Sequence, residues 1–131
     1  MTSKFAKEFL THKIVGGKKM PPDQILSEMF LEAMLWVANK CTPSELLRSV
    51  ESERVYRNVA NGFYITYPDK PNFSNEKEHI MIDESLTYAV INYVAFIINQ
   101  DTFYRDLALE IISDYIANDG KERIFDDGGG I

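Results

Sequence analysis

The sequence contains a single cysteine, Cys41, so no disulfide bond can form within the chain. This is typical of a protein from a reducing compartment, or of one whose core needs no covalent cross-link. With 131 residues, of which 45% are hydrophobic and 26% charged, the chain can bury enough apolar surface for one folded domain. We interpret Cys41, at the end of an apolar helical run, as a packing residue.

Signatures of catalysis and of metal binding are also lacking. The two histidines, His12 and His79, stand alone in polar surroundings, and no glycine-rich phosphate loop or nucleophile elbow occurs. Carboxylate pairs one helical turn apart are present at Glu28 and Glu32 and at Asp106 and Glu110. Both pairs lie mainly opposite the apolar stripes of their helices, where acidic residues are solvated. The sequence therefore predicts no enzyme, no cofactor and no metal site.

Long apolar runs are missing as well. The start of the chain has no stretch of the length that a signal peptide requires, and the uncharged segment 85–100 is too short to span a bilayer. The asparagines in that segment would also be costly in hydrocarbon. We therefore expect no membrane association.

The most informative segment is the one between Glu84 and Asp101, which holds no charged residue. Its polar breaks, at Ser85, Asn92 and Asn99, are seven residues apart and form one narrow stripe on a helix over 84–99. A helix that hides most of its circumference lies in the middle of a packed structure. Because so short a chain has few elements to surround it, we expect neighbouring copies to supply part of its cover.

Apolar residues spaced by three and four predict three other helices, over 4–12, 23–41 and 102–118. Gly16-Gly17 breaks the first helix, and Gly120 is the expected stop for the last. The apolar stripes of the first two helices consist of Phe5, Phe9 and Leu10, and of Ile25, Leu26, Met29, Phe30, Ala33, Met34, Trp36 and Val37.

Two polar patterns predict how helices begin. Thr42-Pro43-Ser44-Glu45 has the form of a capping box, with Thr42 as N-cap and Glu45 reaching back, and predicts a short helix over 43–50. Asp83 is expected to be the N-cap of the helix over 84–99.

The clearest β signal is a hairpin over 55–67. Two β-branched and aromatic segments flank Asn61-Gly62, a pair that favours a type I′ turn because both residues accept positive φ. A single hairpin is marginal in water, so it must pack on the helices or pair with a strand of a neighbouring copy.

Charge is distributed unevenly along the chain. Residues 1–20 carry a net charge of +4, whereas residues 21–131 carry −10. The N-terminal lysines are Lys4, Lys7, Lys13, Lys18 and Lys19. One interpretation is a solvated helix beside an acidic surface, and the other is an arm that docks on an acidic neighbour, such as another copy, or on nucleic acid.

Together these features predict a mainly α fold, a helical bundle of about four helices with one β-hairpin inserted before the last two helices. Residues 1–20 form a basic N-terminal arm or short helix, and residues 21–118 form a single helical domain with the hairpin 55–67. Residues 119–131 form a flexible C-terminal tail that is too rich in glycine for regular structure.

The layout of residues 21–116 resembles the head–tail connector proteins (adaptor or head-completion proteins) of tailed bacteriophages. The resemblance is carried by four segments: Pro21-Pro22-Asp23-Gln24-Ile25, which opens a helix ending near Ala38; the corner Cys41-Thr42-Pro43-Ser44-Glu45-Leu46; the proline-terminated hairpin 55–71; and Ile80-Met81-Ile82-Asp83-Glu84, which leads into an apolar helix and then a helix with Tyr104, Ala108, Ile111, Ile112 and Tyr115.

This resemblance implies a mostly helical protomer in a ring, a dodecamer, beneath the portal of a DNA-filled capsid. Its partners would be other copies of itself, the portal protein and tail proteins, with non-specific contact to packaged DNA and none to a membrane. The protein would be made in the bacterial host cytoplasm and end in the neck of the virion. Terminal extensions would reach the portal or tail.

We select candidate interface residues from the two ends and from the tyrosines, which suit surfaces that are apolar in body and wet at the tip. They are Lys4, Lys7, Lys13, Lys18, Lys19, Tyr56, Tyr64, Tyr67, Ile124, Phe125 and Ile131. Two alternatives to a connector stay open: a small regulatory or inhibitor protein that binds one cellular protein, and an enzyme whose site the sequence does not reveal.

Overall fold

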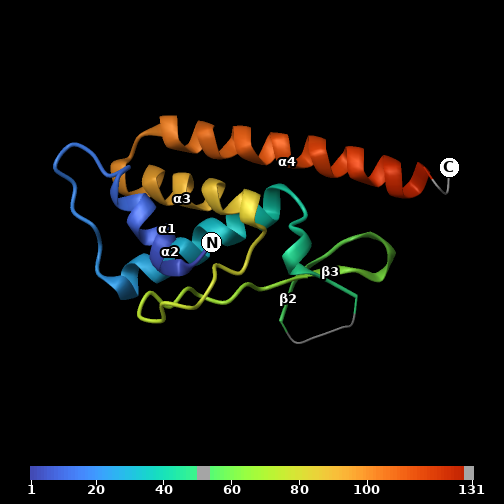
Figure 1. The fold of residues 1–131 in the computed structure, drawn as a ribbon, viewed down its shortest axis with the longest axis horizontal. Helices are drawn as coiled ribbons and strands as arrows, with labels where there is room; N and C mark the ends of the chain where they lie inside the picture. The colour runs from blue at the N-terminus through green and yellow to red at the C-terminus, as the bar shows by residue number, and fades with distance from the viewer. Residues whose placement is uncertain (50–53, 129–131) are drawn as a thin grey trace.

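The computed structural model describes residues 1–49 and 54–128, with side chains as far as residue 118. Figure 1 shows a bundle of helices with a small antiparallel sheet at one side. The elements are α1 (Ser3–Thr11), α2 (Asp23–Lys40), β1 (Leu47–Arg48), β2 (Val55–Asn58), β3 (Tyr64–Thr66), α3 (Glu84–Asn99) and α4 (Thr102–Gly128). The predicted mainly α fold, with a hairpin before the last two helices, is confirmed.

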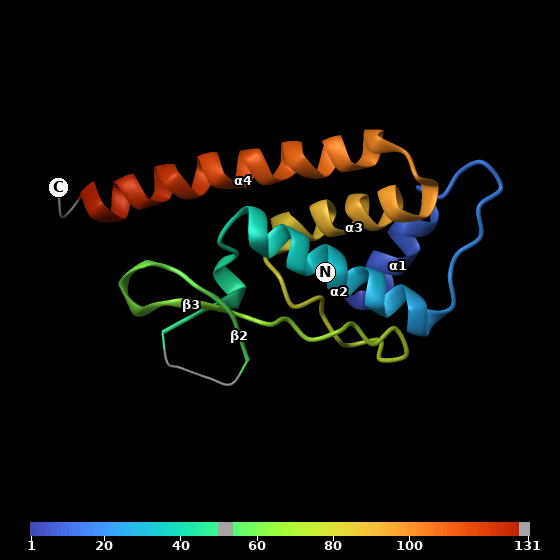
Figure 2. The ribbon, with the colours of Figure 1, turned by 180° about the vertical axis from the view of Figure 1, so that it is seen from behind.

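Helix α3 occupies the middle of the bundle, as its apolar circumference predicted. It packs against α4, α2 and α1 of the same chain, and only Glu84, Ser85 and Tyr88 on it are exposed. Figures 1 and 2 show α4 along one side of α3 from both directions. The expectation that neighbouring copies are needed to cover this helix is therefore wrong, because three helices of its own chain are enough.

Helix α2 follows the predicted bounds closely, and most of its predicted stripe is buried. Leu26, Phe30 and Met34 lie fully within the core. Ile25 is the exception: 52% of it is exposed, because the buried face follows the line of Leu26 and Phe30. Cys41 is a buried free thiol directly after this helix, in keeping with a packing role.

The segment after α2 differs from its prediction. The expected helix over 43–50 is limited to a single 3-10 turn, Ser44–Leu46, followed by β1. Strand β1 pairs antiparallel with β3, Leu47 opposite Ile65 and Arg48 opposite Tyr64, so the sheet has the order β1-β3-β2. The long-range pairing with β3 outweighs the local helical pattern.

The hairpin between β2 and β3 has the predicted turn. Asn61 and Gly62 adopt φ values of 64° and 78°, and the Phe63 amide donates to the Ala60 carbonyl oxygen at 3.4 Å. Positive φ at both central residues is what a type I′ turn requires.

Arg57 ties this hairpin to the helical bundle. From β2 its Nε donates to the Ala38 carbonyl oxygen at 3.0 Å, and its Nη2 donates to the Cys41 carbonyl oxygen at 2.7 Å. Carbonyls at the C-terminus of a helix lack intrahelical partners, and a cation there is favoured by the helix dipole. The hairpin thus packs on the helices of its own chain, which is the first of the two arrangements that the sequence predicted.

The N-terminal helix is part of the bundle and not a free arm. The Ser3 amide donates to the Glu78 carbonyl oxygen at 2.8 Å, and the Ile80 amide donates to the Met1 carbonyl oxygen at 3.0 Å. Leu10 is buried as predicted, whereas Phe5 is exposed, because the small residues Ser3 and Ala6 form the contact face and allow close approach.

Helix α4 continues well beyond its predicted end. The sequence suggested a stop at Gly120 and a flexible tail over 119–131, but the helical backbone runs through Gly120 to Gly128. One glycine inside a helix costs only about 1 kcal/mol relative to alanine, which does not end a helix whose other residues favour it. Both views show this part of α4 running past the first turn of α3.

Candidate interaction site

The point at which α4 leaves the bundle is organised by Asp83. This residue directly precedes α3, as predicted, but its carboxylate caps a different element. Its Oδ2 accepts from the Ser44 amide at 3.0 Å, and its Oδ1 accepts from the Glu45 amide at 2.8 Å. The predicted capping box is therefore wrong: Thr42 is not the N-cap, and the acceptor comes from 38 residues away.

Tyr115 of α4 completes the same cluster. Its hydroxyl donates to Asp83 Oδ2 at 2.6 Å, and the Ser44 amide and Ser44 Oγ lie 3.2 Å and 3.1 Å from that hydroxyl. Burial, followed by the hydrogen bond to Asp83, raises the pKa of Tyr115 from 10.0 to about 12. The phenol therefore stays protonated at neutral pH and acts as a donor. This Asp83–Tyr115–Ser44 cluster joins the corner after α2, the start of α3 and the middle of α4.

A pocket of about 360 Å³ opens beside the cluster. It is lined by Ser44, Asp83, Ser85, Ile111, Asp114, Tyr115 and Asn118. A serine nucleophile needs an adjacent base that takes its proton, and a protonated phenol is not such a base. The hydroxyls and carboxylates of the pocket instead suit hydrogen bonding, so the arrangement positions α4 and offers polar contacts at its exit from the bundle.

Replacing Tyr115 by phenylalanine should change how stability depends on alkaline pH. The folded protein holds the phenolic proton up to a pKa of about 12, whereas the unfolded chain releases it near 10.0. The stabilisation is therefore complete below pH 10 and is lost as pH rises toward 12. Denaturant unfolding at a series of pH values should show a smaller alkaline loss for Tyr115→Phe than for the wild type. In the control variant Tyr67→Phe, which alters an exposed tyrosine, the wild-type slope should be retained.

The predicted N-terminal lysines are not equivalent. Lys4 pairs with Glu76 at 3.0 Å and Lys7 pairs with Asp23 at 2.7 Å, so acidic groups of the same chain already hold both. The ammonium of Lys13 lies 5.3 Å from the centre of the Phe9 ring. Lys18 and Lys19 are exposed on the loop that follows α1.

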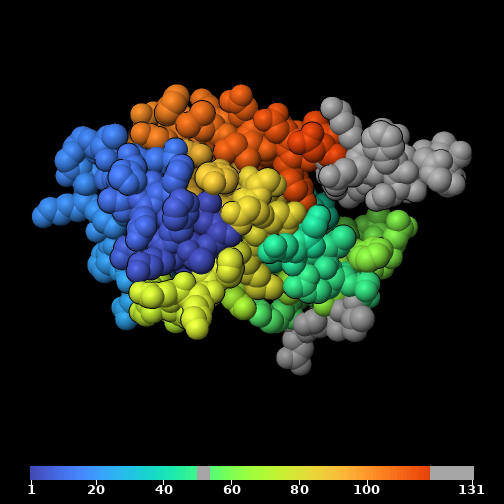
Figure 3. Space-filling view, viewed as in Figure 1, coloured from blue at the N-terminus to red at the C-terminus, as the bar shows by residue number. Residues whose placement is uncertain are grey.

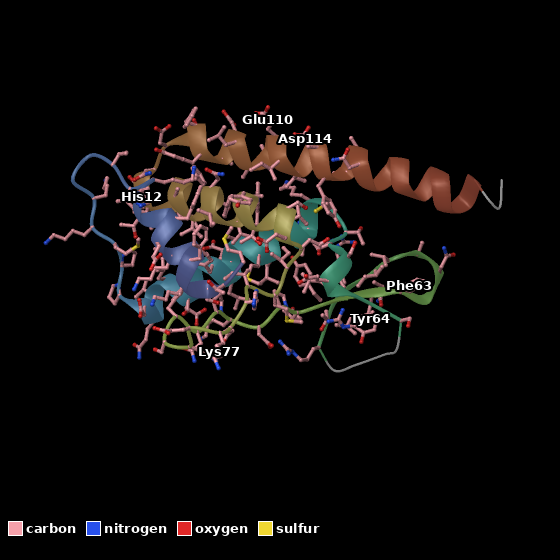
Figure 4. All side chains as sticks on the ribbon, in the orientation of Figure 1. His12, Phe63, Tyr64, Lys77, Glu110 and Asp114 are labelled. Atoms are coloured by element: carbon pink, nitrogen blue, oxygen red, sulfur yellow. The ribbon has the colours of Figure 1, made fainter. Side chains whose placement is uncertain are left out.

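The three predicted tyrosines also differ in access. Tyr56 and Tyr67 pack edge to face, with their ring centres 5.1 Å apart, and Tyr67 is exposed. Tyr64 is only 5% exposed, because β3 is the central strand of the sheet, so this candidate interface residue is covered in the single chain. Figure 4 shows Tyr64 beside the exposed Phe63 at the hairpin.

The last three predicted residues belong to the C-terminal part of the chain. Ile124 and Phe125 lie on the backbone of α4, while their side chains and the whole of Ile131 are outside the described residues. The structure thus does not bring the predicted residues together into one site. It reveals instead the Asp83–Tyr115–Ser44 cluster, of which the sequence signalled only the capping character of Asp83.

Neither a candidate metal centre nor a bilayer-spanning helix is found among the described residues. In residues 1–49 and 54–118, no group of three or more His, Cys, Asp or Glu side chains is arranged to hold a metal ion. Among the helices of the described part of the chain, none combines the length and apolar character that crossing a bilayer requires.

Comparisons with known proteins identified no relative. No family model matches the sequence, and neither the curated proteins nor the solved structures contain a significant match. The connector resemblance is therefore a hypothesis based on the order and character of segments.

Proposed function

We propose that this chain is a non-enzymatic structural protein of a tailed-phage virion, a head–tail connector or adaptor that assembles as a ring between portal and tail. In that position it forms part of the DNA passage in the virion neck, after synthesis in the bacterial host cytoplasm. Its partners are other copies of itself, the portal protein and tail proteins.

The observation that carries this proposal is the extension of α4. Tyr115 contacts Asp83 at the start of α3, so residues 116–128 lie beyond the point at which the two helices separate. At 1.5 Å per residue this part of α4 is about 20 Å long. Ile116, at its base, is an exposed apolar residue. A helix that leaves its bundle in this way is suited to contact a neighbouring component.

The covered position of α3 changes how assembly is expected to proceed. Because the chain buries this helix with its own α1, α2 and α4, the protomer does not depend on neighbours to complete its core. We therefore propose that each protomer folds by itself before it joins the ring at the portal. The support for a connector comes from the segment layout and the extension of α4, and no longer from an incomplete core.

Deleting residues 119–131 tests this proposal. The bundle side chains of α4 that reach the core, Ala108 and Ile112, are retained, so the shortened protein should keep its far-ultraviolet circular dichroism and unfold cooperatively. Its binding to portal rings from the same phage, measured by co-sedimentation and electron microscopy, should fall at least about tenfold, as expected when a contact surface is removed.

Two results would count against the proposal. If the full-length protein ignores the portal, the connector function is wrong. If the deletion unfolds the domain, residues 119–131 belong to the core and are not a contact arm.

A second candidate function is a small regulatory or inhibitor protein that binds one cellular protein. The self-sufficient core favours it, because such a protein works as a monomer. A stable one-to-one complex with a host protein, and no ring on the portal, would support this alternative.

A further inference from the structure

Two lysines at one end of the molecule have no acidic partner among the side chains that the structure describes. Lys18 and Lys19 follow a turn in which Gly16 and Gly17 adopt positive φ, 67° and 74°. Both lysines are exposed, and within residues 1–49 and 54–118 neither ammonium group forms an ion pair or a hydrogen bond. The two lysines of α1, in contrast, are each paired with a carboxylate of their own chain.

The base of this loop is held firmly, which presents the lysines outward. Asn99, at the end of α3, accepts from the Val15 amide at 3.2 Å and donates through Nδ2 to the Lys13 carbonyl oxygen at 2.8 Å. Val15 itself is 50% exposed. Figures 1 and 3 show the loop after α1 as one end of the long axis of the molecule. We call residues 15–19 the lysine loop.

A complementary surface runs along α4, from its outer side to the edge of the pocket beside the Asp83–Tyr115–Ser44 cluster. Asp106, Glu110 and Asp114 are one helical turn apart, all three are exposed, and no described cation pairs with them. Like charges at this spacing repel one another within a helix. Phe103, 57% exposed, lies one turn before Asp106 on the same side. Figure 4 shows Glu110 on the side of α4 away from α3. We call the three acidic residues the carboxylate stripe.

We propose that the lysine loop of one copy docks on the carboxylate stripe of a second copy of this chain. Lys18 and Lys19 would neutralise the repelling carboxylates, and the exposed Val15 would contact Phe103. Each surface carries an apolar residue beside charges of one sign, and the signs are opposite. The inference deepens the proposed function, on which it rests, by naming the contact between neighbouring protomers.

The placement of the two surfaces favours contact between copies over contact within one chain. The loop lies at one end of the long axis, whereas Glu110 and Asp114 lie nearer the middle of α4. Because the two surfaces differ, the contact is head-to-tail, and contacts of this kind close into rings when the rotation per copy allows it.

Reversal of charge tests the contact directly. The variants Lys18→Glu/Lys19→Glu and Asp106→Lys/Glu110→Lys are compared with the wild type by sedimentation equilibrium at low and high salt. The wild type should associate at low salt and weakly at high salt, because screening weakens exposed ion pairs. Each double variant should associate at least about tenfold more weakly, since attraction is replaced by repulsion. The variant that combines all four changes should regain association, because the signs are again opposite.

Lys77→Glu is the matched control. This exposed lysine lies in the loop before α3, away from both surfaces, so its reversal should leave association unchanged. Circular dichroism checks that every variant is folded.

Several outcomes would overturn the inference. A wild type that stays monomeric at the highest concentration, reversals without effect, or a combined variant that does not recover would each do so. If Lys18→Glu/Lys19→Glu abolishes binding to a short DNA duplex but leaves self-association intact, the loop contacts nucleic acid instead. Portal binding by the wild type, measured separately, shows whether the proposed function survives such a failure.

Discussion

Replacing Ile91 by alanine is expected to lower the free energy of unfolding by about 2–5 kcal/mol, as is usual for a large-to-small change in a packed core. Ile91 lies on α3 and is fully buried by the same chain. Truncating it removes apolar contacts and leaves a cavity that the surrounding helices can fill only in part. Chemical denaturation followed by circular dichroism measures the change.

Ile25→Ala is the matched control, because the same side chain is removed from a position that is half exposed. It should alter stability by no more than about 0.5 kcal/mol. The loss caused by Ile91→Ala should also be independent of protein concentration, since the cover of α3 comes from one chain. A loss that shrinks as concentration rises would mean that self-association shelters this helix after all.

Asp83→Ala is expected to cost about 2–4 kcal/mol, because it removes the acceptor for two backbone amides and for the Tyr115 hydroxyl. The corner after α2 would lose the cap of its 3-10 turn, and α4 would lose its polar contact with the start of α3. Thermal and denaturant unfolding should both report the loss.

A double-mutant cycle separates the two parts of this effect. If the carboxylate acts partly through the phenol, Asp83→Ala combined with Tyr115→Phe should cost less than the sum of the single changes. Asp106→Ala, which removes an exposed aspartate from α4, should be nearly neutral and serves as the control. Equal losses in Asp83→Ala and Asp106→Ala would show that the cluster contributes nothing to stability.

The helices that could be predicted are those in which the spacing of apolar residues defines the buried face without help from distant parts of the chain. The spacing over 84–99 matches α3 residue for residue, and α2 differs from its prediction by one residue. The turn at Asn61-Gly62 was equally accessible, because few residues other than asparagine and glycine tolerate positive φ. In each of these cases the physical cause lies within a few neighbouring residues.

The predictions that failed depended on partners distant in sequence. Leu47 and Arg48 satisfy a helical pattern but form a strand, because β3 offers them a ladder. Thr42 has the sequence position of an N-cap. The Glu45 backbone amide is instead capped by the carboxylate of Asp83, which follows the hairpin in the sequence. The sequence left open whether the N-terminal lysines belong to a solvated helix or to a docking arm, and only the structure places Glu76 beside Lys4 and Asp23 beside Lys7.

The candidate site divides in the same way. The sequence marked the lysines and tyrosines as candidate interface residues. The structure shows that some of them are ion-paired, that Tyr64 is buried, and that others are exposed to solvent. The packing of the helices alone determines which lysines are unpaired. It also determines that Tyr115 contacts Asp83.

By itself, the sequence determined that this protein has a helical bundle with an apolar central helix and one hairpin, since periodicity and turn chemistry act locally. Only the tertiary structure decided what covers that helix. A hydrophobic pattern requires burial but is indifferent to whether the covering surface belongs to the same chain or to another, and here three helices of the same chain provide it.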